Sequence, residues 1–325
     1  MPAIAGLLLA PQERDRGRVS DVSDLPAADA THCGLVAVVG APNAGKSTLV
    51  NALVGQKVAI VSPKAQTTRT RLLGVAMRDA TQLLLVDTPG IFDPRRRLDR
   101  AMVAAAWGGT EGADVIAFVV DAKGGLPAKV TEIAESLAGR TEPVYLVLNK
   151  VDIADKPRLL QHAERLNAIR PFAQTFFVSA QTGDGLAELK DALADAMPAG
   201  PWHYPEDQVS DASERALAAE VTREQLYLQL HAELPYASVV ETEKFTDRED
   251  GSAEIHQQIL VERATQRAIV LGKQGARIRE IGARARAELA VLLDRPVHLY
   301  LHVKVKPGWD EDRVVYRDLG LDWVE

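Results

Sequence analysis

The stretch GLVAVVGAPNAGKSTLVNALVG, residues 34–55, decides the fold because an apolar strand, a glycine loop and a helix follow one another directly in it. Gly40 and Gly45 let the loop backbone curl, so that successive N–H groups face one anion. The helix begins directly after the loop, and its positive N-terminus points at the same anion. Lys46 and Ser47 add the ammonium group and the hydroxyl that complete such a site. We therefore predict that this chain binds a nucleoside triphosphate.

Apolar runs alternate with amphipathic stretches from this loop to about residue 197. The later runs read QLLLVDTPG, DVIAFVVDA, VYLVLNKVD and TFFVSA, and each ends in a polar loop. Continuous apolar runs are typical of strands that are buried on both faces, so we predict an α/β domain with a mostly parallel sheet covered by helices. Ligands of such sheets bind at the carboxyl ends of the strands, where the polar motifs of this chain lie.

Composition narrows the class of protein. A net charge of −7 argues against a protein that coats nucleic acid over its whole surface, although a local basic patch remains open. The single cysteine, Cys33, excludes internal disulfides and fits a reducing compartment. The apolar stretch at residues 4–10 is too short to span a bilayer, and no basic residue precedes it as in a secretion signal. We expect a cytoplasmic protein.

Three prolines in PAGPWHYPEDQVS, residues 198–210, interrupt regular structure and predict a boundary between two domains. Trp202, His203 and Tyr204 in this segment are either a hinge or packing residues. Trp309 and Trp323, near the end of the chain, are interpreted as packing anchors. The predicted divisions are a disordered tail at 1–33, a nucleotide domain at 34–197, a linker at 198–210, a second domain at 211–310 and a tail at 311–325.

The second domain has a distinct order of elements. Asp211 and Glu214 resemble a capping box that opens a helix to about Ala232. Two strands near 237–245 and 254–262, a short helix, the loop GKQG and a longer helix follow. The final strand, VHLYLHVKVK, alternates strictly between apolar and polar residues, which predicts one buried face and one face that is solvated or meets RNA.

The motif DTPG, residues 87–90, follows the second of the predicted buried strands. Phosphoryl transfer needs magnesium, and Asp87 can hold this ion. Gly90 lets the backbone approach a γ-phosphate closely. The preceding polar loop, AQTTRTR, contains Thr67 and Thr68, either of which can complete the metal shell when the γ-phosphate is present. Its other polar residues, Arg69, Thr70 and Arg71, are interpreted as solvated.

The motif NKVD, residues 149–152, identifies the base. The Asp152 carboxylate can accept two hydrogen bonds from the N1–H and the exocyclic amine of guanine, which adenine does not offer. Asn149 is expected to fix the loop, and the stem of Lys150 to lie along the base plane. We expect Ser179 and Ala180, in VSA, to offer a backbone N–H to the guanine carbonyl.

The predicted nucleotide contacts come from four motifs, the phosphate loop, DTPG with Ile91, NKVD and VSA. Each motif follows the carboxyl end of a predicted strand. The contacts are Gly40, Ala41, Pro42, Asn43, Ala44, Gly45, Lys46, Ser47, Thr48, Asp87, Thr88, Pro89, Gly90, Ile91, Asn149, Lys150, Asp152, Ser179 and Ala180.

Basic residues concentrate between Arg263 and Arg286, where seven basic side chains stand against the single acid Glu280. Such segregation in an acidic chain suggests contact with a polyanion, although a solvated helix face is the alternative. Glycines in GKQG allow a nucleic-acid backbone to approach, as in modules that clamp single-stranded nucleotides. The predicted RNA contacts are Gly272, Lys273, Gln274, Gly275, Arg277 and Arg279.

The motifs PNAGKST, QTTRTR, DTPG and NKVD, taken in this order, resemble the Era group of ribosome-associated GTPases, and the likeness covers about residues 34–310. It implies a P-loop GTPase domain with a mixed, mostly parallel sheet, followed by an α+β type II KH domain. It also implies GTP and GDP as ligands, the 3′ end of small-subunit ribosomal RNA as partner, and a role in assembly of the small ribosomal subunit. A monomer is expected, and peripheral contact with the inner face of the cell membrane is a feature of the group.

The resemblance also bears on catalysis. It favours Thr68 over Thr67, so that Ser47, Thr68 and Asp87 would hold magnesium. Ile91 stands where many signalling GTPases carry a water-orienting glutamine, which leaves Lys46, Thr68 and the backbone at Gly90 as the catalytic candidates and predicts slow intrinsic hydrolysis. Asn43 resembles the potassium-associated asparagine of related GTPases, which makes potassium a second candidate ion.

Two other functions remain as alternatives. A tRNA-modifying GTPase would share the phosphate loop but carry a reactive cysteine near its carboxyl terminus, whereas the sole cysteine here is Cys33. An RNA-binding scaffold with little turnover would use GTP only for stability.

Overall fold

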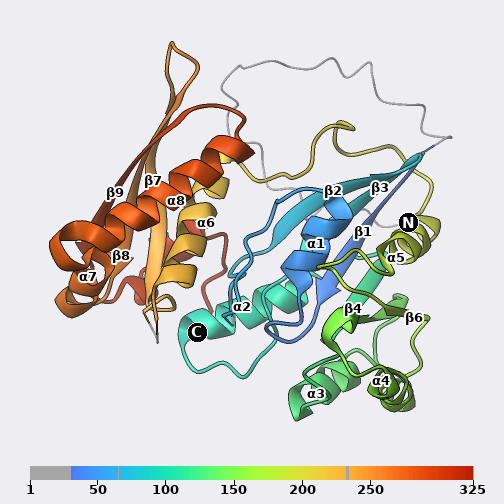
Figure 1. Cartoon of the computed structure of the whole chain (residues 1–325). Helices are drawn as coiled ribbons and strands as arrows, with labels where there is room; N and C mark the ends of the chain where they lie inside the picture. The colour runs from blue at the N-terminus through green and yellow to red at the C-terminus, as the bar shows by residue number, and fades with distance from the viewer. Residues whose placement is uncertain (1–30, 65, 232–233, 325) are drawn as a thin grey trace.

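The computed structural model describes residues 31–64, 66–231 and 234–324. Two sheets organise these residues (Figure 1). The six-stranded sheet has the order β2-β3-β1-β4-β5-β6, and the three-stranded sheet has the order β7-β8-β9. In the first sheet only the β2–β3 pair is antiparallel. The predicted fold, a mixed and mostly parallel GTPase sheet followed by a KH-like α+β unit, is confirmed.

The elements of the first sheet follow the apolar runs of the sequence. Its strands are β1 (His32–Val39), β2 (Leu72–Arg78), β3 (Thr81–Asp87), β4 (Val115–Asp121), β5 (Val144–Asn149) and β6 (Gln174–Phe177). Its helices are α1 (Lys46–Val54), α2 (Arg97–Gly108), α3 (Ala128–Ser136), α4 (Lys156–Ile169) and α5 (Leu186–Asp195), with the 3₁₀ turn η2 (Val151–Ile153).

Alternate residues of β1 face opposite layers of helices. Val36 and Val38 pack in one core with α1 and α5. Ala37 and Val39 pack in the other core with α2, α3 and α4. Both faces of the sheet are therefore covered, which explains why its strands are apolar without alternation. The phosphate loop follows β1, DTPG follows β3 and NKVD follows β5, so all three meet at one edge.

The second unit shows the predicted order of elements. They are α6 (Glu214–Gln229), β7 (Ser238–Asp247), β8 (Ala253–Val261), α7 (Ala264–Leu271), η3 (Lys273–Gly275), α8 (Ala276–Leu292) and β9 (Val297–Val305). Strand β8 pairs antiparallel with β7 and parallel with β9. On β9, Val297 and Val303 are buried whereas Tyr300 and His302 are exposed, as the alternation predicts.

Helix α6 begins differently from the prediction. The side chain of Ser213, not Asp211, accepts the capping hydrogen bond, at 3.2 Å from the N–H of Ala216. Ser213 has this role because it lies three residues before that donor, the spacing that capping requires. The helix ends at Gln229, and the expected end at residue 232 lies outside the described residues.

The segment 198–210 packs against the first sheet. The indole N–H of Trp202 donates to the carbonyl of Ala80, at 3.0 Å. The side-chain oxygen of Gln82 accepts from the N–H groups of His203 and Tyr204, at 2.9 and 3.0 Å. These contacts favour the packing interpretation of the aromatic residues over the hinge.

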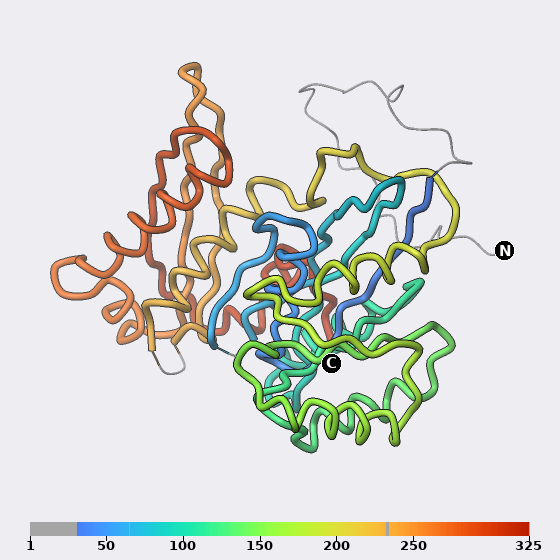
Figure 2. Tube along the Cα trace, turned by 45° about the vertical axis from the view of Figure 1, so that its right-hand side comes forward, coloured from blue at the N-terminus to red at the C-terminus, as the bar shows by residue number. Residues whose placement is uncertain are grey.

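The two predicted tails have different outcomes in the described residues. Most of the predicted N-terminal tail, residues 1–30, lies outside the described residues, but β1 already begins at His32. After β9 the chain forms η4 (Trp309–Glu311) and α9 (Arg313–Asp318) and returns to α2, as Figure 2 shows. Trp309 is buried there, and Trp323 packs against the same cluster. Among the described residues, no helix has the length and apolar character needed to cross a membrane.

Candidate nucleotide and RNA sites

The phosphate loop needs glycine at two positions. A Cβ atom on Gly40 would lie 2.2 Å from the carbonyl oxygen of Val119, and one on Gly45 would lie 2.3 Å from the Asn149 amide nitrogen. Both residues also have positive φ, 153° and 93°. The loop therefore packs closely on its neighbours, which leaves its backbone fixed before any nucleotide binds.

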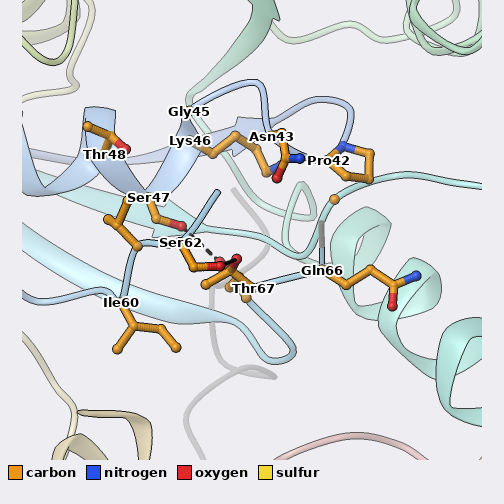
Figure 3. Close-up of a pocket in the computed structure, with 13 residues that line it drawn as sticks. Pro42, Asn43, Gly45, Lys46, Ser47, Thr48, Ile60, Ser62, Gln66 and Thr67 are labelled. Carbon is orange, nitrogen blue, oxygen red and sulfur yellow. Dashed lines mark hydrogen bonds between the residues drawn. The ribbon is translucent and has the colours of Figure 1, made fainter. Parts of the chain in front are cut away.

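Lys46 lies at the start of α1 and is buried against the loop. Its ammonium group donates to the carbonyls of Gly40 and Ala41, at 3.2 and 3.1 Å. Burial lowers the pKa of Lys46 to about 8, although the Asp87 carboxylate opposes this shift. The side chain thus spans the concave side of the loop, and Figure 3 shows it opposite Ser62 and Thr67 across the pocket.

Three side-chain oxygens converge beside Lys46. Ser47 Oγ lies 2.6 Å from Asp87 Oδ2 and 2.8 Å from Thr68 Oγ1, and Thr68 Oγ1 lies 3.2 Å from the same carboxylate oxygen. Neighbouring ligands of magnesium, each at 2.0–2.1 Å from the ion, are about 3 Å apart, so this spacing fits an octahedral edge. Asp87 is fully buried, its Oδ1 has no partner among the described residues, and burial raises its pKa. The residues fit a magnesium ion.

The structure separates the two candidate threonines. Thr67 Oγ1 lies 2.8 Å from Ser62 Oγ and donates to the carbonyl of Lys64, also at 2.8 Å. Thr68 is the one that reaches Ser47 and Asp87, in agreement with the preference for Thr68. The side chain of Thr67 thus points into the loop itself, whereas that of Thr68 points toward the oxygens of Ser47 and Asp87.

The DTPG motif approaches the phosphate loop directly. A Cβ atom on Gly90 would lie 2.9 Å from the Cα of Pro42, so only glycine fits this contact. The N–H of Ile91 donates to the carbonyl of Gly40, at 3.0 Å. The Ile91 side chain is buried in the core, and the Thr88 hydroxyl donates to Val38. No side chain of this motif other than Asp87 is therefore placed to act on a nucleotide.

Asn149 ties three predicted motifs together. Its amide nitrogen donates to the carbonyl of Ala44 in the phosphate loop, at 3.0 Å. Its amide oxygen accepts from the N–H groups of Lys150 and Ala180, at 2.8 and 3.0 Å. The predicted role of Asn149, fixing the base loop, matches this geometry. Asp152 is exposed, and its carboxylate has no partner among the described residues, as a group that awaits a ligand requires.

Lys150 is held by a residue that the sequence analysis missed. Its ammonium group lies 2.6 Å from Asp121 Oδ2 and donates to the carbonyl of Asn43, also at 2.6 Å. Asp121 ends β4 at the same sheet edge as the other motifs, and this position in DVIAFVVDA was the signal that could have identified it.

The prediction for VSA needs a correction. The N–H of Ser179 donates to the carbonyl of Asp184, and the N–H of Ala180 donates to Asn149, so neither donor is free for a guanine carbonyl. Both bonds form because the chain turns sharply after β6. Within this turn, Gln181 is among the residues whose N–H has no partner in the described part of the chain.

The GKQG loop joins α7 to α8 through three residues with positive φ, Gly272 at 70°, Gln274 at 52° and Gly275 at 74°. Lys273, Gln274 and Arg279 are exposed, as a nucleic-acid contact requires. Arg277 differs, because its guanidinium donates to the carbonyl of Gln229 at the end of α6, at 2.9 Å. The structure therefore brings most of the predicted RNA contacts to one loop and assigns Arg277 a partner within the protein.

The interpretation of Arg69 as a solvated residue is wrong. Its side chain is only 3% exposed and contacts Pro235, Tyr236 and Ser238, where the chain leads into β7. The sequence offered no local signal for this burial, because the contacted residues lie more than 150 positions away. Arg71, two residues further on, is exposed as expected.

Comparisons with known proteins agree with this geometry. The family model described as "50S ribosome-binding GTPase" matches residues 35–150, and a KH-domain model matches residues 233–310. The GTPase Era of Erythrobacter litoralis is 60% identical over 296 residues, which cover 90% of this chain and 97% of that protein. The GTPase Era of Brucella suis biovar 1 is 53% identical over 90% of this chain and 94% of that protein.

Solved structures show the same architecture over nearly the whole chain. Era in complex with MgGDPNP and nucleotides 1506–1542 of 16S ribosomal RNA superposes with a TM-score of 0.85 at 38% identity. An Era variant of Aquifex aeolicus bound to GDP·AlF4− gives the same two values. Each match covers 89% of this chain and 99% of the other. The chain therefore belongs to the Era family of GTPases.

Proposed function

We propose that this GTPase is a switch that binds the 3′ end of small-subunit ribosomal RNA and assists assembly of the small ribosomal subunit. The observation that carries the proposal is the joint presence of a Ser47–Thr68–Asp87 oxygen cluster and an exposed GKQG loop in one folded chain. The Era structure with 16S ribosomal RNA nucleotides supports the choice of RNA. We further propose that the protein acts as a cytoplasmic monomer.

In this proposal the phosphate loop and Lys46 bind and orient the triphosphate of GTP. Ser47, Thr68 and Asp87 hold magnesium, which neutralises charge on the phosphates when it is bound. The backbone at Gly90 lies against the phosphate loop and senses the γ-phosphate. Asp152 binds the edge of the guanine base. Asn149 and Lys150 hold the NKVD loop, residues 149–152, against the phosphate loop. Because the Ile91 side chain is buried, intrinsic hydrolysis is slow and leaves room for stimulation by RNA.

Single-turnover hydrolysis tests the proposed function. A 16S ribosomal RNA 3′-end fragment is expected to accelerate GTP hydrolysis, because a switch must read its partner, and a scrambled RNA of the same length should not. Equal rates with both RNAs, measured by release of labelled phosphate, would show that the two domains do not work together in this way.

Replacing Thr68 by alanine is expected to lower kcat by roughly 10- to 100-fold, because a metal ligand is removed and the reacting groups are then poorly positioned. GDP affinity should stay the same, since Thr68 acts only when the γ-phosphate is present. Thr70→Ala, in the same loop, is the matched control and should hydrolyse GTP normally. A normal rate for Thr68→Ala would instead contradict the assigned metal shell.

Potassium is proposed as an activating ion at Asn43. This residue is exposed and has a φ of 62°, and its amide nitrogen donates to the carbonyl of Pro63, at 3.3 Å. Its amide oxygen has no partner among the described residues, which leaves it available to a cation that stabilises charge on the phosphates. Turnover is therefore expected to be several-fold faster in potassium than in sodium buffer. Asn43→Ala should remove the difference, and equal rates of the unaltered protein in both salts would exclude the ion.

A further inference from the structure

Arg69 is a buried cation whose hydrogen-bond partners are three carbonyl groups and one hydroxyl group. Its guanidinium donates to the carbonyls of Ser238, Pro235 and Tyr236, at 2.8, 3.1 and 3.2 Å, and to the hydroxyl of Tyr227, at 3.3 Å. No ion pair joins it to a carboxylate among the described residues, and Glu220 acts on its charge only from a longer distance. A buried charge is costly unless hydrogen bonds replace its water, so these acceptors hold the guanidinium firmly in one place.

The acceptors belong to a turn that is organised by its own hydrogen bonds. The N–H of Ala237 donates to the carbonyl of Leu234, at 3.2 Å, and the Ser238 hydroxyl donates to the carbonyl of Pro235, at 3.1 Å. This turn joins α6 to β7, and both elements pack in the core of the KH-like unit. The carbonyls that receive Arg69 are therefore fixed by the second unit, not by the loop that carries Arg69.

The same loop has further anchors on α6. The carboxylate of Glu224 accepts from the N–H of Val61, at 2.7 Å. Lys64 donates to the carbonyls of Tyr227 and Leu230 at the end of α6. The Tyr227 hydroxyl donates to the carbonyl of Gln66, at 3.3 Å. Four residues of the loop thus contact the second unit, namely Val61, Lys64, Gln66 and Arg69.

Thr68 immediately precedes Arg69 and reaches in the other direction. Its hydroxyl lies 2.8 Å from Ser47 Oγ and 3.2 Å from Asp87 Oδ2, inside the nucleotide domain. A single peptide unit therefore connects the oxygen cluster to a guanidinium that is held by the second unit. Without the guanidinium, the loop would keep its contacts at Val61, Lys64 and Gln66. It would lose the anchor directly next to Thr68, so the Thr68 hydroxyl would be held less firmly at the oxygen cluster.

We propose that Arg69 is a positioning residue for GTP hydrolysis, through which the KH-like unit holds the Thr68 hydroxyl at the metal site. The proposal rests on the role of Thr68 given under the proposed function. The second domain thereby supports the loop that carries Thr68, from within the same chain. Arg69 touches neither the phosphate loop nor the base loop, so nucleotide binding through those loops does not depend on it.

The test uses the full-length protein with Arg69→Ala, Arg69→Lys and the exposed neighbour Arg71→Ala as a matched control. Arg69→Ala is expected to lower kcat for GTP by about 10-fold or more, with KM for GTP changed little, because positioning is lost while the binding groups remain. The magnesium concentration for half-maximal hydrolysis should rise, and GDP affinity should not change. Arg69→Lys should restore part of kcat, and Arg71→Ala should match the unaltered protein.

A double substitution shows whether Arg69 acts through Thr68. If it does, Thr68→Ala with Arg69→Ala together are no slower than Thr68→Ala alone, since the first change already removes what Arg69 positions. Losses that multiply would overturn the proposal. So would Arg69→Ala with a lowered melting temperature but an unchanged kcat and magnesium dependence, because this result describes a contact that serves stability alone.

Two further outcomes are informative. A normal rate for Thr68→Ala would overturn the metal assignment and this proposal together, whereas a slow Thr68→Ala beside a normal Arg69→Ala overturns this proposal alone. If Arg69→Ala folds poorly, Tyr227→Phe decides the question, because it removes one acceptor of Arg69 and the donor to Gln66 without emptying the core. A smaller fall in kcat of the same kind supports the proposal, and an unchanged kcat contradicts it.

Discussion

Replacing Asp152 by asparagine is expected to weaken GTP binding by about a thousandfold or more, because a site that loses a matched hydrogen-bond partner rejects its ligand strongly. Guanine presents two donors, its N1–H and its exocyclic amine, to the carboxylate. An asparagine amide offers one acceptor and one donor, so its NH2 group would face the amine of the base. Xanthosine triphosphate carries a carbonyl in place of that amine and should become the preferred nucleotide.

Isothermal titration calorimetry with GTP, ATP and xanthosine triphosphate measures this change. The matched control is Asp155→Asn, an exposed carboxylate three residues further on that lies 3.4 Å from Arg158. The control protein should bind GTP normally, since Asp155 is the N-cap residue of α4 and asparagine serves as well at that position. The interpretation of the base site would be wrong if the unaltered protein bound ATP as tightly as GTP.

The phosphate loop was predictable because strand, loop and helix are encoded in one continuous stretch. Gly40 and Gly45 mark positions where the backbone itself forbids a side chain, and such positions are visible in a sequence. Asn149 was predictable for a similar reason, since NKVD follows a buried strand at the edge where ligands bind. The three prolines of residues 198–210 also predicted a boundary between two domains, because they interrupt regular structure.

Arg69 and Ser179 show what the sequence could not reveal. An arginine between threonines in a polar loop is usually solvated, and its burial depends on a turn near residues 235–238 that only tertiary contact brings close. Ser179 and Ala180 were correctly placed near the base loop, but their N–H groups are occupied by a turn and by Asn149. In both cases the sequence does not show which hydrogen-bond partner each group finds, whether that partner is distant, as for Arg69, or in the same turn, as for Ser179.

The loop that carries Thr68 and the segment that follows Gly90 both contact the second unit. Arg69 reaches the turn before β7, as described above. Phe92, two residues after Gly90, packs against a cluster that joins Met102 of α2 to Trp309 and Tyr316. Arg97, at the start of α2, stacks on the ring of Trp323, with its guanidinium carbon 4.4 Å from the ring centre. Both loops therefore contact residues that belong to the KH-like sheet or follow it in the chain.

Reversing charge at Lys273 and Arg279 together is expected to weaken binding of the 16S ribosomal RNA 3′ end by about a hundredfold or more, because two phosphate contacts become repulsive. Substituting glycines of GKQG would be a less informative test. A Cβ atom on Gly272 would lie 2.7 Å from the Cβ of Arg277, so aspartate at this position would disturb the fold as well as the RNA. Lys273 and Arg279 are exposed and can be changed without that cost.

The control, Arg284→Glu with Arg286→Glu, carries the same change of net charge further along α8. Both control residues are exposed and lie at least nine residues beyond Gly275, about two and a half turns along α8. In fluorescence anisotropy titrations the Lys273→Glu/Arg279→Glu protein should also show a salt dependence reduced by about two, one unit for each lost phosphate contact. Basal GTP hydrolysis should be unchanged in both proteins, because neither pair lies near the nucleotide. Equal loss of RNA affinity in the two proteins would mean that the charge of the helix, and not the GKQG loop, determines binding.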